Sequence, residues 1–273
     1  MTVTQNQQRD PEMQATLWRT LTDQAETLAT TSPALGPYIR SSVLQREGFA
    51  DCLAHVLGSA LVHAAPPEVD LAPELLKLYA HNPGVVDAAA EDLVKLDAVN
   101  PACPDLLTGL LSFRGFQALQ VYRLAHAMWQ SGEKQFGALV QNWGALKYAI
   151  DIHPGARIGR RVFIDHGIGL VVGETSVIED DVNIWHGVTL GSTLTESGDR
   201  HPKIRRGATI CAGATILGNI EVGEFALVAA DTVVLKNVPA RTVVVGVPGR
   251  LAGPVPGRLD AIDEAVKRLA TTA

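Results

Sequence analysis

Aliphatic residues recur every six positions between residues 152 and 234, with a two-residue slip after Ile164 and a longer interruption after Leu190. The repeated positions are Ile152, Ile158, Ile164, Val172, Ile178, Ile184, Leu190, Ile204, Ile210, Ile216, Val222, Val228 and Val234. A helix with about 3.6 residues per turn would spread these positions around its whole circumference. Short strands joined by turns return the same face inward at every repeat. The spacing therefore predicts a β-solenoid.

A second set of small or aliphatic side chains follows four residues after most of the repeated positions. Its members are Ala156, Val162, Ile168, Ser176, Val182, Val188, Ala208, Ala214, Ile220, Ala226 and Thr232. We expect them to share the inward face. Glycines directly after a repeated aliphatic residue suit the corners, where tight bends favour residues that tolerate unusual backbone angles; these are Gly159, Gly173, Gly191 and Gly223.

Apolar residues before position 150 recur at helical intervals instead, for example at Leu53, Val56, Leu57 and Leu61. Asp70 can cap a helix that Asn82-Pro83-Gly84 separates from the next one. Residues 108–150 form a long apolar-rich helical stretch (GFQALQVYRLAHAMW, then QFGALVQNWGALKYAI) that leads into the first strand without a flexible linker. The fold class is α+β, with an α-helical domain at 1–150, the solenoid at 151–253 and a tail at 254–273.

The end of the chain contains several prolines and a short helical pattern. Prolines from Pro239 onward end the solenoid after Val238, and residues 258–270 (RLDAIDEAVKRLA) form an amphipathic helix that caps or flanks the last coil.

Composition excludes several classes of function. The formal net charge is -6 and the pI about 5.7, so the basic surface of a nucleic-acid-binding protein is absent. Cys52, Cys103 and Cys211 have no metal-ligand spacing and are expected to be reduced, buried residues; we predict no metal site. No segment has the roughly 18 apolar residues of a membrane span. These features indicate a cytoplasmic protein.

Both interruptions of the six-residue repeat contain histidine. His166 follows Asp165 in FIDHGIG, where the period slips by two residues, and a slip of this kind can turn a side chain out of the wall. His201 follows Arg200 in SGDRHP, within an excursion at 191–203 that suggests a ligand site. The histidines of the helical half fit helical patterns and need no functional explanation: His55, His63, His81 and His126.

Several longer motifs resemble the serine acetyltransferases of the left-handed β-helix (hexapeptide-repeat) acyltransferase family. They are DIHPGARIG, FIDHGIGLVVGET, GDRHPKIRRGATICAGATILGNIEVG and VVGVPGR, with LLSFRGFQALQVYRLAH in the helical half. The resemblance spans roughly residues 15–253 and implies a left-handed parallel β-helix. It also implies transfer of an acetyl group from acetyl-CoA to the hydroxyl of L-serine, for cysteine biosynthesis.

The resemblance assigns roles to individual residues. His166 would be the general base that takes the proton of the serine hydroxyl, with Asp151 as its partner. Asp165 would bind the serine ammonium group, and Arg200 and His201 would bind its carboxylate. A hydroxyl is a weak nucleophile near neutral pH, and a positioned imidazole contributes roughly 10² to 10⁴-fold in rate. The attack would be direct, without a covalent enzyme intermediate.

The resemblance also implies how coenzyme A binds and how the chains assemble. Coenzyme A would lie in a groove between neighbouring solenoids, near Gly191, Ala212 and Gly213, with Lys236 and Arg250 at its phosphates. The chains would form homotrimers that the helical domains pair into hexamers. The terminal sequence RLATTA lacks the isoleucine with which many members enter cysteine synthase, so the resemblance does not extend to that complex.

Three positions depart from the family pattern. Asn100 stands where the family has an aspartate that helps to bind the substrate ammonium. Gly167 and Ile168 replace the family's Ala-Thr pair. Leu194 ends the segment that reads GGTG in the family and GSTL in this chain. These changes favour two alternatives, another small hydroxy or amino acceptor or another acyl-CoA. A non-catalytic assembly or regulatory homologue is a further alternative, disfavoured because the proposed catalytic and serine-binding residues Asp151, Asp165, His166, Arg200 and His201 are all present.

Overall fold

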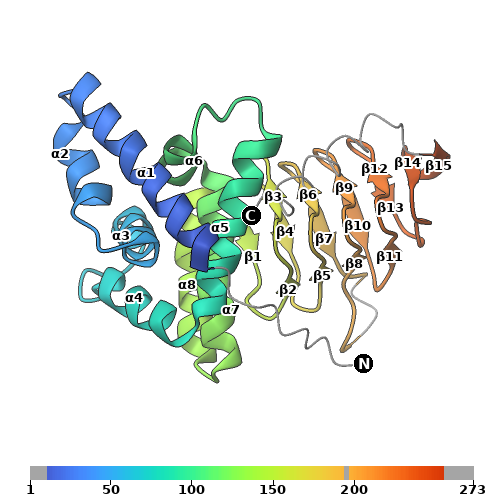
Figure 1. The fold of residues 1–273 in the computed structure, drawn as a ribbon. Helices are drawn as coiled ribbons and strands as arrows, with labels where there is room; N and C mark the ends of the chain where they lie inside the picture. The colour runs from blue at the N-terminus through green and yellow to red at the C-terminus, as the bar shows by residue number, and fades with distance from the viewer. Residues whose placement is uncertain (1–10, 194–196, 255–273) are drawn as a thin grey trace.

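The computed structural model describes residues 11–193 and 197–254. The first half is helical (Figure 1). Its elements are α1 (Pro11–Thr31), α2 (Gly36–Ile39), the π-helix η1 (Arg40–Leu44), α3 (Phe49–Leu61), α4 (Leu71–His81), α5 (Pro83–Val99), α6 (Leu106–Ser112), α7 (Arg114–Gln130) and α8 (Lys134–Tyr148).

The predicted helical stretch at 108–150 is divided into separate helices. A turn at 131–133, with Gly132 at φ 95°, reverses the chain so that α7 and α8 pack as a hairpin. The two helices match the two predicted segments, and helical periodicity alone does not report the turn between them. α8 ends at Tyr148 and the first strand begins at Asp151, which confirms the absence of a flexible linker. Asp70 precedes α4 but makes no side-chain capping bond.

The second half is a parallel β-helix with three sheets. Its strands are β1 (Asp151–Ile152), β2 (Arg157–Ile158), β3 (Phe163–Ile164), β4 (Val171–Val172), β5 (Val177–Ile178), β6 (Asn183–Ile184), β7 (Thr189–Gly191), β8 (Lys203–Ile204), β9 (Thr209–Ile210), β10 (Thr215–Leu217), β11 (Glu221–Val222), β12 (Leu227–Val228), β13 (Val233–Val234), β14 (Thr242–Val245) and β15 (Arg250–Pro254). Sheet A has the order β1-β4-β7-β10-β13, sheet B β11-β8-β5-β2 and sheet C β15-β14-β12-β9-β6-β3. The predicted fold class is confirmed.

The interior of the β-helix follows the six-residue repeat. Every repeated aliphatic residue is buried except Ile158, which is half-buried. The second inward set is also buried, apart from half-buried Ile220 and exposed Ile168. Ile168 was predicted to point inward and is 47% exposed, because the two extra residues of the slip move the inward position to Leu170.

The corner glycines serve a different purpose from the one predicted. Gly159, Gly173, Gly191 and Gly223 do not have left-handed backbone angles. They are small because the next coil approaches closely; a Cβ at Gly223 would lie 2.5 Å from the backbone nitrogen of Ala240. Left-handed angles at other corners are adopted by larger residues such as Arg161 and Asp181.

The stack of strands continues past Val238, up to the solenoid boundary predicted at about residue 253. β14 pairs in parallel with β12, and β15 then returns antiparallel to β14. Pro239 lies in a corner between coils, so the expectation that the prolines end the repeat after Val238 was wrong. The predicted helix at 258–270 lies outside the described residues.

A buried ion pair fixes the helical half to the first coil of the β-helix. Asp92 of α5 accepts hydrogen bonds from Arg123 Nε of α7 at 2.8 Å and from the backbone N–H of Val162 at 3.1 Å. Arg123 Nη2 donates to the carbonyl oxygen of Gly159 at 2.7 Å. Burial raises the pKa of Asp92, and the positive charge of Arg123 opposes that shift. Two helices and the solenoid wall therefore meet at one carboxylate.

A second set of charges reinforces this junction from the surface. Glu91 of α5 binds Arg160 at 2.6 Å and Arg161 at 2.7 Å. Arg161 also pairs with Asp180 and Asp181 on the second coil. The helical half is thus joined to two successive coils.

Replacing Asp92 with alanine tests the importance of this junction. The substitution leaves Arg123 buried without its counter-charge, and we expect the free energy of unfolding to fall by about 3 to 5 kcal/mol. Urea denaturation measures the change. Glu74→Ala is the control, because its exposed pair with Lys77 contributes at most about 1 kcal/mol. Equal effects of the two substitutions would contradict this account.

Candidate active site

The two-residue slip forms an enlarged corner between β3 and β4, at residues 165–169. His166 lies there at φ 54°, and 72% of its side chain is exposed. Gly167 and Gly169 also adopt left-handed angles, and the N–H of Gly169 donates to Ala149 at 2.7 Å. The expectation that the slip turns His166 out of the wall is confirmed.

Asp151 lies beside this corner. Its backbone N–H donates to the carbonyl of Leu170, and Ile150 packs against Gly167. The Asp151 carboxylate accepts a hydrogen bond from Gln141 Nε2 of α8 at 2.6 Å, and no hydrogen bond joins it to His166 in the described part of the chain. The single chain brings Asp151 and His166 to one corner without joining them. Their predicted partnership stays a prediction.

Two other side chains border His166. Asp165 Oδ2 lies 3.8 Å from His166 Nε2. The His186 ring, at the equivalent place on the next coil, lies 5.9 Å from the His166 ring in an edge-to-face arrangement. His186 had no role assigned from the sequence. The pairing of β3 with β6 places the two histidines next to each other, and the six-residue register could have revealed it.

A second cluster of polar residues follows β4, where the excursion returns to the wall. His201 is only 7% exposed, and its Nδ1 accepts the backbone N–H of Thr175 at 3.2 Å. The Thr175 hydroxyl lies 2.9 Å from the same nitrogen and accepts the backbone N–H groups of Arg200 and His201. Because Nδ1 is an acceptor, the proton lies on Nε2. Burial, Arg200 and Lys203 lower the pKa of His201, so a neutral ring presents one N–H donor.

Gly173 is required for this placement of His201. A Cβ at Gly173 would overlap Nε2 and Cδ2 of the His201 ring. From the sequence, Gly173 was predicted only as a corner residue. The contact comes from a histidine in the long excursion, which the repeat alone cannot position.

Ion pairs hold Arg200 and the end of the 191–203 excursion in place. Arg200 Nη2 donates to Glu174 at 2.8 Å, and this hydrogen bond lowers the pKa of Glu174. Lys203 Nζ donates to Asp199 at 2.5 Å and to the carbonyl of His201 at 2.6 Å. Leu194, where the family pattern changes, lies outside the described residues.

His153 directly follows β1, and the pairing of β1 with β4 places it beside Gly173 and the second cluster. Its Nδ1 accepts the N–H of Gly155 at 2.9 Å, and its ring lies edge-on to Trp129 at 5.1 Å. Burial lowers the pKa of His153, whereas Glu174 and Asp151 raise it. His153 had no role assigned from the sequence, because its contact with Trp129 depends on how the helices pack.

The two polar clusters lie at opposite ends of sheet A. Residues 165–169 precede β4, whereas Gly173 and the residues that contact it follow β4. We call these the His166 corner (165–169) and the Arg200 corner (173–175 and 199–203). Asn100 lies just beyond α5, which packs on β3, and its Oδ1 accepts the N–H of Ala102 at 3.0 Å. No hydrogen bond connects Asn100 to either corner in the described part of the chain.

The predicted coenzyme A residues are divided between the same two ends. Ala212 and Gly213 lie at the corner equivalent to the His166 corner, two coils further along the β-helix. The Gly213 N–H donates to the carbonyl oxygen of His186 at 2.9 Å. Gly191 ends β7 at the other end of sheet A, while Lys236 and Arg250 are exposed on the last coils. One chain alone does not bring these residues to a single surface.

The cysteines are only partly as predicted. Cys52 and Cys103 are buried, but Cys211 is half-buried, because it lies at a corner beside Ala212. Residues 11–193 and 197–254 contain no cluster of three potential metal ligands among His, Cys, Asp and Glu. No helix within these ranges is long and apolar enough to cross a membrane.

Comparison with known proteins decides the family. The family model described as "Serine acetyltransferase, N-terminal" matches residues 17–121. The serine acetyltransferase of Haemophilus influenzae is 41% identical over 235 residues, covering 86% of this chain and 88% of that protein. This chain belongs to the serine acetyltransferase family. The predicted resemblance is confirmed.

Solved structures of the serine acetyltransferase family have the same fold. The enzyme from Brucella abortus in complex with coenzyme A has a TM-score of 0.84 and 39% identity, covering 88% of this chain and 96% of that chain. A serine acetyltransferase in complex with cysteine has a TM-score of 0.84 and 40% identity, covering 88% and 99%.

Gly173→Ala tests the packing of the Arg200 corner. The added methyl group must displace the buried His201 ring, and overpacking of this kind costs about 1 to 3 kcal/mol of unfolding free energy. Urea denaturation measures the loss. Gly84→Ala is the control, because its new Cβ would meet only Arg160 Nη2, at 3.8 Å. A Gly173→Ala protein as stable as the control would show that His201 is not held as described.

Proposed function

We propose that this chain transfers the acetyl group of acetyl-CoA to the hydroxyl of L-serine, giving O-acetylserine for cysteine biosynthesis. The observation that carries the proposal is the exposed imidazole of His166 at a corner shared with Asp151, in a chain of the serine acetyltransferase family. The coenzyme A complex of the Brucella relative supports acetyl-CoA as the cosubstrate.

His166 is the general base of the proposed reaction. Its imidazole takes the proton of the serine hydroxyl while the hydroxyl oxygen attacks the carbonyl carbon of the thioester. The tetrahedral intermediate collapses by breaking the carbon–sulfur bond, and the imidazolium returns the proton to the leaving sulfur. Asp151 holds the other ring nitrogen of His166 and stabilises the imidazolium. The products are O-acetylserine and free coenzyme A.

The Arg200 corner suits the carboxylate of serine. The Nε2–H of His201 and the guanidinium of Arg200 are charged or polar donors that other residues already hold in place. Donors fixed before binding lose little conformational entropy when the ligand arrives. Asp165, on the His166 corner, supplies the negative charge for the serine ammonium.

The proposed site is completed by a neighbouring chain. His166 and Arg200 lie at opposite ends of sheet A, so two parallel solenoids side by side can bring the His166 corner of one chain to the Arg200 corner of the next. A head-to-tail contact of this kind closes into a ring, as in a trimer. Coenzyme A then lies between the solenoids, and Ala212 and Gly191 come from different chains. Pairing of trimers through the helical domains would give the hexamer.

Release of coenzyme A thiol from acetyl-CoA tests the proposed function directly. We expect serine to give a kcat/KM well above those of homoserine and threonine, with acetyl-CoA preferred over longer acyl-CoAs. Release dependent on another acceptor in place of serine would redirect the proposal to that substrate. Absence of release with every acceptor would contradict acyl transfer.

His166→Ala tests the general base. We expect kcat to fall by roughly 10² to 10⁴ while the fold is kept, because an exposed corner side chain contributes little to the core. Stopped-time thiol release gives the rate, and circular dichroism monitors folding. His63→Ala, which changes an exposed histidine of the helical half, should leave kcat unaltered. A folded His166→Ala protein with near-normal turnover would show that another group removes the proton.

Asn100→Asp tests whether residue 100 lies near the ammonium of the acceptor. A carboxylate there would add a charge-assisted hydrogen bond, and we expect KM for serine to fall by about tenfold or more. Inhibition by cysteine, which has the same ammonium and carboxylate groups, should strengthen in parallel. Asn82→Asp adds the same charge at the other end of α5 and serves as the control. If both variants match the wild type toward every acceptor, residue 100 does not contact the substrate.

A further inference from the structure

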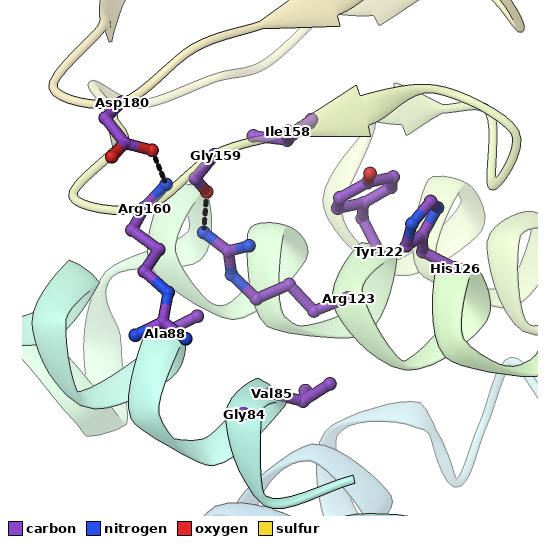
Figure 2. Close-up of a pocket in the computed structure, with 10 residues that line it drawn as sticks. All are labelled: Gly84, Val85, Ala88, Tyr122, Arg123, His126, Ile158, Gly159, Arg160 and Asp180. Carbon is purple, nitrogen blue, oxygen red and sulfur yellow. Dashed lines mark hydrogen bonds between the residues drawn. The ribbon is translucent and has the colours of Figure 1, made fainter. Parts of the chain in front are cut away.

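A pocket lies at the junction of the helical half and the β-helix, apart from both corners described above. Its volume is about 360 Å³, and its walls come from α5, α7 and the first two coils (Figure 2). Residues of this pocket have no part in the proposed acetyl transfer. His126, which had no function assigned from the sequence, lines the pocket.

The carboxylates around the pocket have no free acceptor atom. Both oxygens of Glu91 bind arginine, one to Arg160 and the other to Arg161. Asp180 accepts the backbone N–H of Arg160 with one oxygen and Arg161 with the other. Both oxygens of Asp92 are likewise occupied.

The backbone carbonyls at the pocket are also occupied. Tyr122 donates its hydroxyl to Ala156 at 2.7 Å, and His126 Nδ1 lies 2.7 Å from the carbonyl oxygen of Pro154. Arg123 Nη2 occupies the carbonyl of Gly159. The negative groups of the wall are therefore used within the protein.

Two guanidinium groups retain unused donors. Arg123 is only 7% exposed, and its Nη1 makes no hydrogen bond to any described residue. Figure 2 shows this nitrogen on the side of the guanidinium that faces away from Arg160, toward Tyr122. Arg160 Nη2 is also without a hydrogen bond to the described residues, and it faces the first turn of α5, 3.8 Å from the Cβ position of Gly84. Both nitrogens are reached by solvent, so their N–H groups are available to a ligand.

The beginning of α5 adds to the preference for negative charge. Gly84 and Val85 line the pocket, and Asn82 at the N-cap makes no side-chain capping bond. The first N–H groups of a helix have no partner inside the helix, and its dipole favours anions at this end. Ala88 and Ile158 supply an apolar wall for the carbon atoms of a small ligand.

We propose that this junction pocket binds a small oxyanion, the carboxylate or phosphate group of a metabolite, through Arg123 and Arg160. Such a ligand contacts the helical half and the first coil at once, so its binding strengthens their docking. A ligand in this pocket also acts on the loop of His153 through two side chains of the wall. Tyr122 and His126 hydrogen-bond this loop at the carbonyls of Ala156 and Pro154. This makes the pocket a candidate effector site, distinct from the acyl-transfer site.

Calorimetric titration of the full chain tests the proposal with two probes, inorganic phosphate and succinate. Saturating coenzyme A is present throughout, so that neither probe binds in its place. We expect one anion per chain, with Arg160→Gln weakening binding by at least about tenfold, as the loss of a charged hydrogen bond predicts. Arg19→Gln, which removes an exposed arginine of α1, should bind as the wild type does. The tighter probe identifies the preferred oxyanion.

Gly84→Asp provides a second test that does not depend on removing an arginine. The new carboxylate has room at the first turn of α5, where acidic residues are favourable, and it should occupy the place of the anion beside Arg160. We expect a higher melting temperature without ligand and loss of anion binding, whereas Gly84→Ala keeps binding. The proposal is overturned if neither probe binds the wild type, or if Arg160→Gln and Gly84→Asp bind as the wild type does.

Discussion

Coil-on-coil stacking of parallel strands is the constraint on which the rest of this structure depends. Each strand inside a sheet pairs with one strand on the coil before it and one on the coil after it. A side chain can therefore leave the regular inward or outward position only where residues are added to the repeat. The chain adds residues at 165–170 and at 191–203, and these two places hold the exposed His166 and the ordered pair Arg200 and His201. Regular pairing supplies the rigidity, and the two interruptions supply the polar groups.

The helical half is attached to this stack by a small number of charged contacts. Asp92, Arg123 and Glu91 connect α5 and α7 to the first coils, and the junction pocket lies among them. A buried ion pair is costly to desolvate, and it is tolerated here because backbone groups of the first coil complete its hydrogen bonds. Orientation of the helices relative to the β-helix thus depends on the same residues that shape the proposed oxyanion site.

Most of the β-helix could be predicted because a six-residue period leaves one consistent set of inward positions. The prediction failed at Ile168, where the slip moves the inward position to Leu170, and at Val238, where β14 continues the stack. The His166 corner was identified from the slip itself. The contacts of Gly173 with His201 and of Gln141 with Asp151 involve segments distant in sequence or in another element, and periodicity has no information about them.

The most direct measurement of the central claim uses mixed oligomers of two inactive chains, His166→Ala and His201→Ala. If each site takes His166 from one chain and His201 from the next, random assembly of equal amounts of the two variants into trimers leaves about one quarter of the sites intact. Thiol release should then rise to about a quarter of the wild-type rate, far above either variant alone. A mixture no more active than its separate components would contradict a site assembled between chains and place both histidines in one chain's own site.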